Sequence, residues 1–453
     1  MSNQSRLLIL FALPCIVGLF IVTASKHFNY TPDDTYIYLQ FARNIIHGNG
    51  VSFNAGEPTY GFTSPLWLFL ISICGKCGVD LYTAAKSLDL VFAGVALIVF
   101  CLLANEIIRD AAIAICATVA FSLNIWFLRW TGTGMETSLS VLLLLAAILF
   151  CLRNQYILSI IVAALLALVR PETVFLSGFI LADVYMNSND KQRATKLAVV
   201  MALIVAGILA PWLVYAKSVF GTIIPNTALA KAGFHFSIDD ISSTSSDLFK
   251  TLFASDGIAL VVLIVAGLSL PRKLRIVDAE HAEYAIEKFV LFRQCFVAIT
   301  WIAFLILFYI VTGTNVVSRY LLLCTPFIVI YAFWYLQRYL AISKWNRFMY
   351  PAIFILTAII MLQSQVFYRR TVLPGIEAFQ SGLETCLIPI GTWLHEHTSA
   401  DAVVYTPDVG AIGYFSERKI CDGAGLISPA MLALVRQGYT NDMMMSQKMF
   451  QSQ

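Results

Sequence analysis

Two adjacent carboxylates, Asp33 and Asp34, are the residues of this sequence best suited to acid–base chemistry. They follow the first hydrophobic segment and open the run 36–47, in which apolar residues recur at helical spacing on one face. An acid pair outside a membrane, followed by an amphipathic helix lying on its surface, suits chemistry on a lipid-linked substrate. One Asp would accept the proton of an acceptor hydroxyl while other groups position the substrate.

The same residues also fit a purely structural interpretation. With Thr31 as N-cap, Pro32 at the first helical position and Asp34 at the third, they resemble a capping box. The helix dipole would favour both carboxylates there. The two interpretations are compatible, because a helix start is a rigid place to mount a base.

Further polar residues interrupt apolar sequence and are candidates for binding the substrate. They are Glu136, Arg170, Glu172, Asn226, Lys231, Arg319 and Tyr320. Ionisable residues at membrane depth are costly unless they are paired or functional. Arg170, Lys231 and Arg319 would neutralise a phosphate, and Glu136 would orient a sugar or the catalytic Asp.

Each of these residues has a structural alternative. Glu136 would be an acid at the start of the following helix, and Arg170 and Glu172 would pair with each other in a hairpin turn. Lys, Arg and Tyr at a membrane interface are common anchors, so Lys231 and the Arg319–Tyr320 pair are weak signals when taken singly.

The composition indicates a polytopic membrane protein. The chain has 453 residues, of which 59% are hydrophobic and 13% are charged, whereas about 25% of residues are charged in a typical soluble domain. A net charge of +3 is too small to indicate binding to nucleic acid.

A membrane span needs about 20 apolar residues, or somewhat fewer where a bundle is locally thin. Eleven candidates result: 7–24, 81–104, 111–128, 137–152, 156–169, 173–185, 196–215, 257–270, 294–311, 318–336 and 348–366. The run 65–74 is too short to cross and is expected on the outer surface. The distribution of Lys and Arg favours a cytoplasmic N-terminus. All the polar motifs then fall on the outer side.

The sequence divides into two parts. Residues 1–368 form the predicted transmembrane catalytic domain, with an outer loop over 25–80 and its juxtamembrane helices. Residues 369–453 are less hydrophobic and are predicted to form a small periplasmic α/β domain, with a strand over 401–405. Cys386 and Cys421 could form a disulfide in an oxidising space. Cys74 and Cys77 have CxxC spacing without a second pair, so packing is favoured over zinc or redox chemistry.

The order of the motifs resembles that of the bacterial GT-C glycosyltransferases, and within them the AftB-type arabinofuranosyltransferase group and its relatives. The resemblance covers nearly the whole chain: DDTYI (33–37), FARN (41–44), GNG (48–50), YGFTSPLW (60–67), TGMET (133–137), RPE (170–172), PNT (225–227) with Lys231, SRY (318–320) and DVGAIGY (408–414). It implies an all-α, GT-C-like polytopic fold with an outward-facing cavity. The general base would map to Asp33 or Asp34, with a slight preference for Asp33. The tail is shorter than that of the mycobacterial members, so arabinose does not follow from the resemblance.

These observations together predict an integral-membrane glycosyltransferase of the bacterial inner membrane, with its active site and C-terminus in the periplasm. It would move a sugar from a polyprenyl-phosphate donor to a hydroxyl of an envelope glycan or glycolipid, with inversion if the displacement is single and in line. Lipopolysaccharide, capsule, protein and cell-wall arabinan stay open as acceptors, in that order of preference. A divalent metal is compatible with carboxylates and phosphate, although the sequence has no clear metal-ligand spacing.

Two other classes stay open. One is a lipid or glycan transporter or flippase, but its polar residues would be expected near the bilayer midplane and its chain in two similar halves. The other is a non-enzymatic envelope-assembly factor that binds through its tail. Deleting the tail should inactivate such a factor, whereas an enzyme would keep some transfer to simple acceptors.

Overall fold

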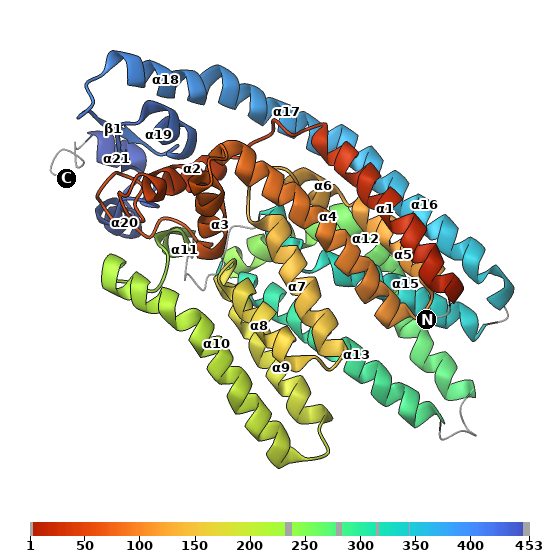
Figure 1. The fold of residues 1–453 in the computed structure, drawn as a ribbon. Coiled ribbons are helices and arrows are strands. Elements are labelled where there is room, and N and C mark those ends of the chain that lie inside the picture. Colours follow the sequence, from red (N-terminus) through yellow and green to blue (C-terminus); the bar gives the residue numbers. More distant parts are fainter. Residues whose placement is uncertain (1–2, 232–237, 278–282, 314–316, 344, 447–453) are drawn as a thin grey trace.

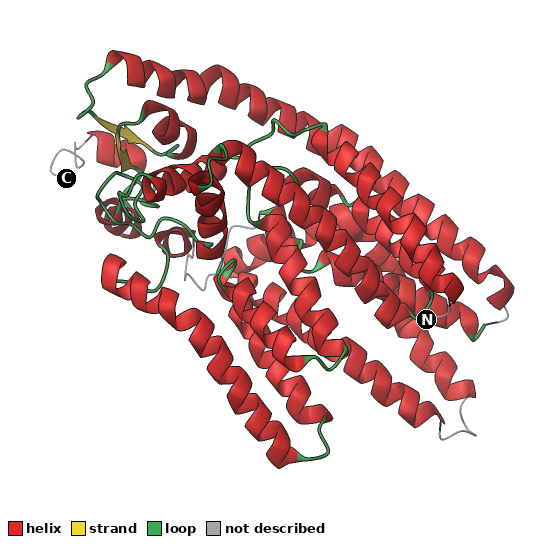
Figure 2. Cartoon of the chain, viewed as in Figure 1, coloured by secondary structure: helices red, strands yellow, loops and turns green. Residues whose placement is uncertain are grey.

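The structure is a computed structural model that describes residues 3–231, 238–277, 283–313, 317–343 and 345–446. The described chain is almost entirely helical (Figure 2). The long helices lie side by side, and shorter elements gather at one end of the bundle (Figure 1).

The elements of the bundle and its outer loops are α1 (Asn3–Ser25), α2 (Asp33–Ile46), α3 (Pro65–Lys76), α4 (Leu81–Ile108), α5 (Ala111–Ser122), α6 (Ile125–Trp130), α7 (Thr137–Leu152), α8 (Tyr156–Ala167), the 3₁₀ turn η1 (Pro171–Thr173), α9 (Val174–Asn187), α10 (Lys191–Phe220), α11 (Asn226–Lys231), α12 (Ile238–Val277), α13 (Glu283–Val311), α14 (Ser318–Leu321) and α15 (Thr325–Ala341). Acidic side chains fix several of the helix starts. The carboxylates of Asp80, Asp110 and Asp190 accept backbone N–H groups at the first turns of α4, α5 and α10.

Five helical segments of the described chain are long and apolar enough to cross a membrane: Gln4–Ser25, Leu81–Ile108, Lys191–Phe220, Ile241–Ala266 and Asn346–His397. Other predicted spans correspond to shorter helices, among them α5, α7 and α8. The total of eleven spans therefore stays a prediction.

Two of the predicted spans are broken. The span over 111–128 was expected to be continuous, but α5 ends at Ser122 and Asn124 starts a new helix by accepting the N–H groups of Trp126 and Phe127. The span over 318–336 is divided between α14 and α15, and Pro326 lies in the first turn of α15.

The capping interpretation of the α2 start is wrong. Pro32, not Thr31, occupies the N-cap position, and the Thr31 hydroxyl lies against the carbonyl of Asn29 and the hydroxyl of Tyr82. The carboxylates of Asp33 and Asp34 have partners in other parts of the chain. Their place at a helix start is therefore not explained by capping.

Most of α2 is buried within the protein, although its amphipathic pattern predicted a helix with one polar face. Polar and apolar residues of α2 are buried alike, including Gln40 and Asn44. The side-chain amides of both donate to the backbone carbonyl of Phe53 in the loop that follows. The helix is covered because α3 and a segment from the C-terminal part of the chain pack against it.

The end of the chain begins with one long helical segment. Its elements are η2 (Asn346–Phe348), α16 (Met349–Phe367), the π-helical turn η3 (Tyr368–Val372), α17 (Leu373–Gly382), a second π-helical turn η4 (Leu383–Leu387) and α18 (Ile388–His397). The predicted domain boundary between residues 368 and 369 lies inside this segment, which runs continuously from Asn346 to His397.

We call residues 401–446 the C-terminal module. It contains β1 (Val403–Thr406), α19 (Gly410–Ser416), β2 (Lys419–Asp422), α20 (Pro429–Arg436) and α21 (Asn441–Ser446). The two strands are parallel, with Val403 opposite Lys419 and Thr406 opposite Asp422. The module lies at the same end of the bundle as α2, α3 and α11 (Figure 1). Cys386 and Cys421 are free thiols, so the disulfide considered from the sequence is not formed.

Candidate active site

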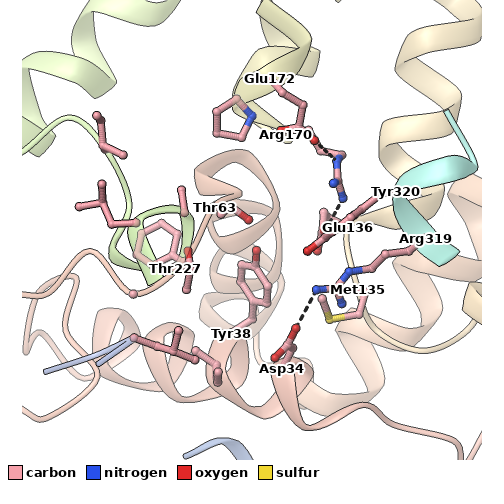
Figure 3. Close-up of a pocket in the computed structure, with 18 of the residues that line it drawn as sticks. Asp34, Tyr38, Thr63, Met135, Glu136, Arg170, Glu172, Thr227, Arg319 and Tyr320 are labelled. Carbon is pink, nitrogen blue, oxygen red and sulfur yellow. Dashed lines mark hydrogen bonds and ion pairs between the residues drawn. The ribbon is translucent and has the colours of Figure 1, made fainter. Parts of the chain in front are cut away.

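The described part of the chain has a cavity of about 340 Å³ where the outer loop, the start of α7, the α8–α9 connection and α14 meet (Figure 3). Its lining includes six residues that the sequence analysis selected: Asp34, Glu136, Arg170, Glu172, Arg319 and Tyr320. They come from segments far apart in the chain, and the fold brings them together in one cavity.

Asp34 and Arg319 form an ion pair in this cavity. The Asp34 Oδ2 atom lies 2.7 Å from Nη2 of Arg319, and the Asp34 side chain is 37% exposed whereas that of Arg319 is 8% exposed. Arg319 also lies over the rings of Trp130 and Tyr320, at 5.3 and 5.5 Å from their centroids. The cation is therefore fixed by its packing, and it holds an accessible carboxylate in place.

Arg170 is bound to two carboxylates. Its Nε lies 2.9 Å from Glu172 Oε1, and its Nη1 lies 3.4 Å from Glu136 Oε1. The Tyr309 hydroxyl also donates to Glu172 Oε1, at 3.1 Å. The pairing of Arg170 with Glu172 was the structural alternative in the sequence analysis, and it is present. Figure 3 shows that these side chains nevertheless lie around the cavity.

Glu136 has one oxygen that is not occupied by Arg170. Its Oε2 is buried and has no hydrogen-bond partner in the part of the chain that the structure describes. A buried carboxylate oxygen without a donor is costly. Because Glu136 lines the cavity, this oxygen can accept a hydrogen bond from a bound hydroxyl or amine.

Asp33 has a different location from Asp34. Its Oδ2 accepts the N–H of Gly410 at 2.9 Å, and its Oδ1 accepts the N–H of Ala411 at 2.7 Å. Burial raises the pKa of Asp33, while these two backbone bonds act in the opposite direction. Asp33 is thus bound to the C-terminal module, whereas Asp34 lines the cavity.

Two further candidates belong to α11. Asn226 is buried, and its backbone N–H donates to the carbonyl of Tyr60 at 2.9 Å. The cavity wall here is formed by the next residues, Thr227, Ala228 and Leu229. Lys231 ends α11, and its side chain lies outside the described residues.

Two charged residues of α4, Lys86 and Asp89, support the site and were not predicted from the sequence. Lys86 donates to the carbonyls of Phe28, Tyr30 and Gly132, the latter two at 2.9 and 3.0 Å. The Asp89 carboxylate accepts the N–H groups of Thr133 and Gly134, at 2.9 and 3.2 Å, and the Ser138 hydroxyl. They hold the glycine turn that precedes Glu136. A Lys and an Asp three residues apart inside a predicted span were a signal that could have been used.

Aromatic hydroxyls were also missed. Tyr38, on α2, and Tyr309, on α13, both line the cavity. Burial raises the pKa of Tyr38 further above its usual value, and the nearby Glu136 carboxylate adds to this shift. Tyr38 therefore stays protonated and can donate. Neither residue interrupts the pattern of its helix, so neither could be recognised from the sequence.

A divalent metal was left open by the sequence. In the described residues, no group of three His, Cys, Asp or Glu side chains is arranged to hold a metal ion. The carboxylates of the cavity are bound to arginines instead.

Solved structures with a similar fold include ArnT from Cupriavidus metallidurans bound to undecaprenyl phosphate, with a TM-score of 0.64 and 11% identity over 92% of this chain and 88% of that one. The apo state of ArnT matches with a TM-score of 0.63 and 12% identity, over 94% and 88% of the two chains. The archaeal oligosaccharyltransferase AglB from Archaeoglobus fulgidus, in complex with an inhibitory peptide and a dolichol-phosphate, matches with a TM-score of 0.57 and 14% identity, over 90% of this chain and 64% of that one.

These likenesses define the class of fold: the chain is a multi-pass membrane protein that shares the fold of ArnT and AglB. A family described as a "Domain of unknown function (DUF8728)" matches residues 376–453, which cover the C-terminal module and the last part of the long helical segment before it. A search of curated proteins finds no match.

Proposed function

We propose that the protein is a glycosyltransferase that moves a sugar from a polyprenyl-phosphate donor to a hydroxyl of an acceptor. The observation that carries this proposal is the Asp34 carboxylate, which is partly exposed in the cavity and held by Arg319 at 2.7 Å. The GT-C fold adds support, because ArnT has been solved with undecaprenyl phosphate and AglB with a dolichol-phosphate.

The proposed reaction is a single displacement. Asp34 takes the proton of the acceptor hydroxyl, and the hydroxyl oxygen forms a bond to the anomeric carbon of the donor sugar. The bond between that carbon and the phosphate oxygen breaks, and its electron pair leaves with polyprenyl phosphate. The leaving group is already an anion, so the second carboxylate of a glycoside hydrolase is not required. In-line attack inverts the anomeric configuration.

The phosphate would lie closest to Arg319. The guanidinium of Arg170 is already neutralised by Glu136 and Glu172, whereas Arg319 pairs with the partly exposed Asp34. Lys231 stays a candidate for the phosphate as well. A cation next to the leaving oxygen stabilises the charge that develops during displacement.

The remaining lining suits the other parts of the donor. Apolar side chains from the α10–α11 connection, from α11 and from the end of α13 form one wall, including Ile224, Leu229 and Phe308. We place the start of the prenyl chain along them. The sugar would lie near Glu136, whose Oε2 can accept one of its hydroxyls. The periplasmic face of a bacterial inner membrane, an envelope glycan or glycolipid as acceptor, and kinship with the AftB-type group belong to the same proposal.

The test is transfer by the purified full-length protein with a panel of polyprenyl-phosphate sugars and a simple hydroxyl acceptor. We expect one donor to be consumed, with release of polyprenyl phosphate and a product of inverted configuration by NMR. A product of retained configuration would contradict the single displacement. Movement of lipid or glycan across vesicles without turnover of any donor would favour the transporter instead.

A further inference from the structure

We propose that the C-terminal module is bound to the catalytic end of α2 by the Asp33 carboxylate, and that this bond positions Asp34 for catalysis. The inference rests on the proposed function of Asp34. It gives Asp33 a positioning role and makes the module part of the active site.

The contact at Asp33 is close and specific. Both of its oxygens accept consecutive backbone N–H groups, from Gly410 at 2.9 Å and from Ala411 at 2.7 Å. Residue 410 must be small, because a Cβ on Gly410 would lie 2.6 Å from the Asp33 carboxyl carbon. We call this contact the Asp33 clasp. Two charge-assisted bonds to one side chain fix both its position and its orientation.

The Asp33 clasp is linked to the cavity because the next residue in the chain, Asp34, lines the cavity. Asp33 and Asp34 are consecutive at the start of α2, and successive helical residues point about 100° apart. One carboxylate can therefore bind the module while the next faces the cavity. A rotation of this first turn that loosens the clasp would also move Asp34 away from Arg319, its partner at 2.7 Å.

A second contact brings the module to the cavity itself. Leu426, in the loop after β2, is one of the residues that line the cavity. Its neighbour Ile427 is buried in the same hydrophobic cluster as Phe41 and Phe62 of the outer loop region. The Asp422 carboxylate shapes this loop, because it accepts the N–H groups of Ala424 and Ile427 at 2.7 and 2.9 Å. The module thus contributes a wall of the cavity.

The module also contacts α2 far from the cavity, and this contact provides a control. Arg43 donates to the carbonyl of Tyr414 at 2.9 Å, pairs with Glu417 at 3.3 Å, and lies 3.7 Å from the centroid of the Tyr414 ring. Arg43→Ala removes contacts between the same two elements and leaves the clasp intact. It separates general docking of the module from the specific effect of Asp33.

The experiment combines two measurements on the full-length protein: hydrogen exchange in the peptide that contains Gly410 and Ala411, and steady-state transfer from the active polyprenyl-phosphate sugar. Asp33→Asn and Gly410→Ala should each speed exchange in this peptide about tenfold or more, because bonds to a charged acceptor are lost. They should lower kcat about 10- to 100-fold with a nearly unchanged KM for the donor, since a displacement of the base of about 1 Å is enough for such a loss.

The double variant should be no worse than either single one. Arg43→Ala should keep kcat within about twofold, because a partly exposed ion pair contributes little.

The outcomes separate this inference from the proposed function. Normal exchange in Asp33→Asn would show that the clasp does not hold the module. Faster exchange with a wild-type kcat would show that the clasp is real but does not position Asp34. If the wild-type protein transfers no sugar from any donor, the proposed function fails and the coupling fails with it, while the exchange data still report on the clasp.

Discussion

Asp33 and Asp34 are adjacent in sequence, but each has a partner in a distant part of the chain. Asp34 pairs with Arg319 in the cavity, and Asp33 accepts two N–H groups of the C-terminal module. In the proposed mechanism, the two carboxylates have different tasks: Asp34 acts as the base, and Asp33 fixes the first turn of the helix that carries it.

The buried ion pairs of Arg170 with Glu136 and Glu172 allow a test of how single residues stabilise the site. Arg170→Ala would leave the Glu136 and Glu172 carboxylates buried without their cation. We expect a loss of about 3–5 kcal/mol in stability, because removal of one partner leaves uncompensated buried charges. The measurement is the free energy of unfolding in detergent micelles.

A matched control for this prediction is the pair formed by Arg153 and Glu106. Their atoms lie 3.1 Å apart, as close as those of the buried pair, but the side chains are 40% and 39% exposed. Arg153→Ala should cost at most about 1 kcal/mol. Equal losses of unfolding free energy in Arg170→Ala and Arg153→Ala would contradict the prediction that burial makes the Arg170 pairs more important.

The glycine turn between α6 and α7 shows how one element positions residues of another. Gly134 has a φ of +82°, and its carbonyl accepts the indole N–H of Trp67 at 3.1 Å. The Asp89 carboxylate of α4 accepts the N–H groups of this turn. The position of Glu136 in the cavity therefore depends on α3 and α4 as well as on its own helix.

Gly134→Ala tests this dependence. An added Cβ would lie 2.9 Å from the Thr35 Cγ2 atom, next to Asp34, and would occupy an unfavourable backbone conformation. We expect a loss of about 1–3 kcal/mol in stability together with reduced transfer. Gly178→Ala, in α9, is the control, because nothing lies within 4 Å of its added Cβ. If both variants behave like the wild type, the turn does not position the site.

Some features of the site and the fold could be predicted from the sequence, and others could not, because only some of them leave a local pattern in it. Charged residues that interrupt apolar sequence are visible without a structure, and so Asp34, Glu136, Arg170, Glu172 and Arg319 were found. The local pairing of Arg170 with Glu172 was anticipated as well. The distant partners were not, because contacts over more than 100 positions, such as that of Asp34 with Arg319, leave no periodicity in the sequence. The breaks in two spans were missed because Asn124 and Pro326 act locally within otherwise apolar runs.

For the whole molecule, the position of the C-terminal module changes what we expect when the tail is deleted. From the sequence alone, an enzyme without its tail should keep some transfer to simple acceptors. With the structure, we expect no transfer without the tail, because the module packs on α2 and Leu426 lines the cavity. A chain that ends after Thr398 should lose transfer to every acceptor while its helical content changes little. Wild-type rates with a simple acceptor would contradict this prediction, and circular dichroism reports the helical content.

The proposed function depends above all on Asp34 as the general base of sugar transfer. Its most direct test is the single-turnover rate of Asp34→Asn with the active polyprenyl-phosphate sugar, beside the wild type and Asp401→Asn, which alters an exposed carboxylate of the module. General base catalysis contributes about 100- to 10,000-fold. We therefore predict a loss in this range for Asp34→Asn in protein that still folds, and a normal rate for Asp401→Asn. A wild-type rate in Asp34→Asn would contradict the account.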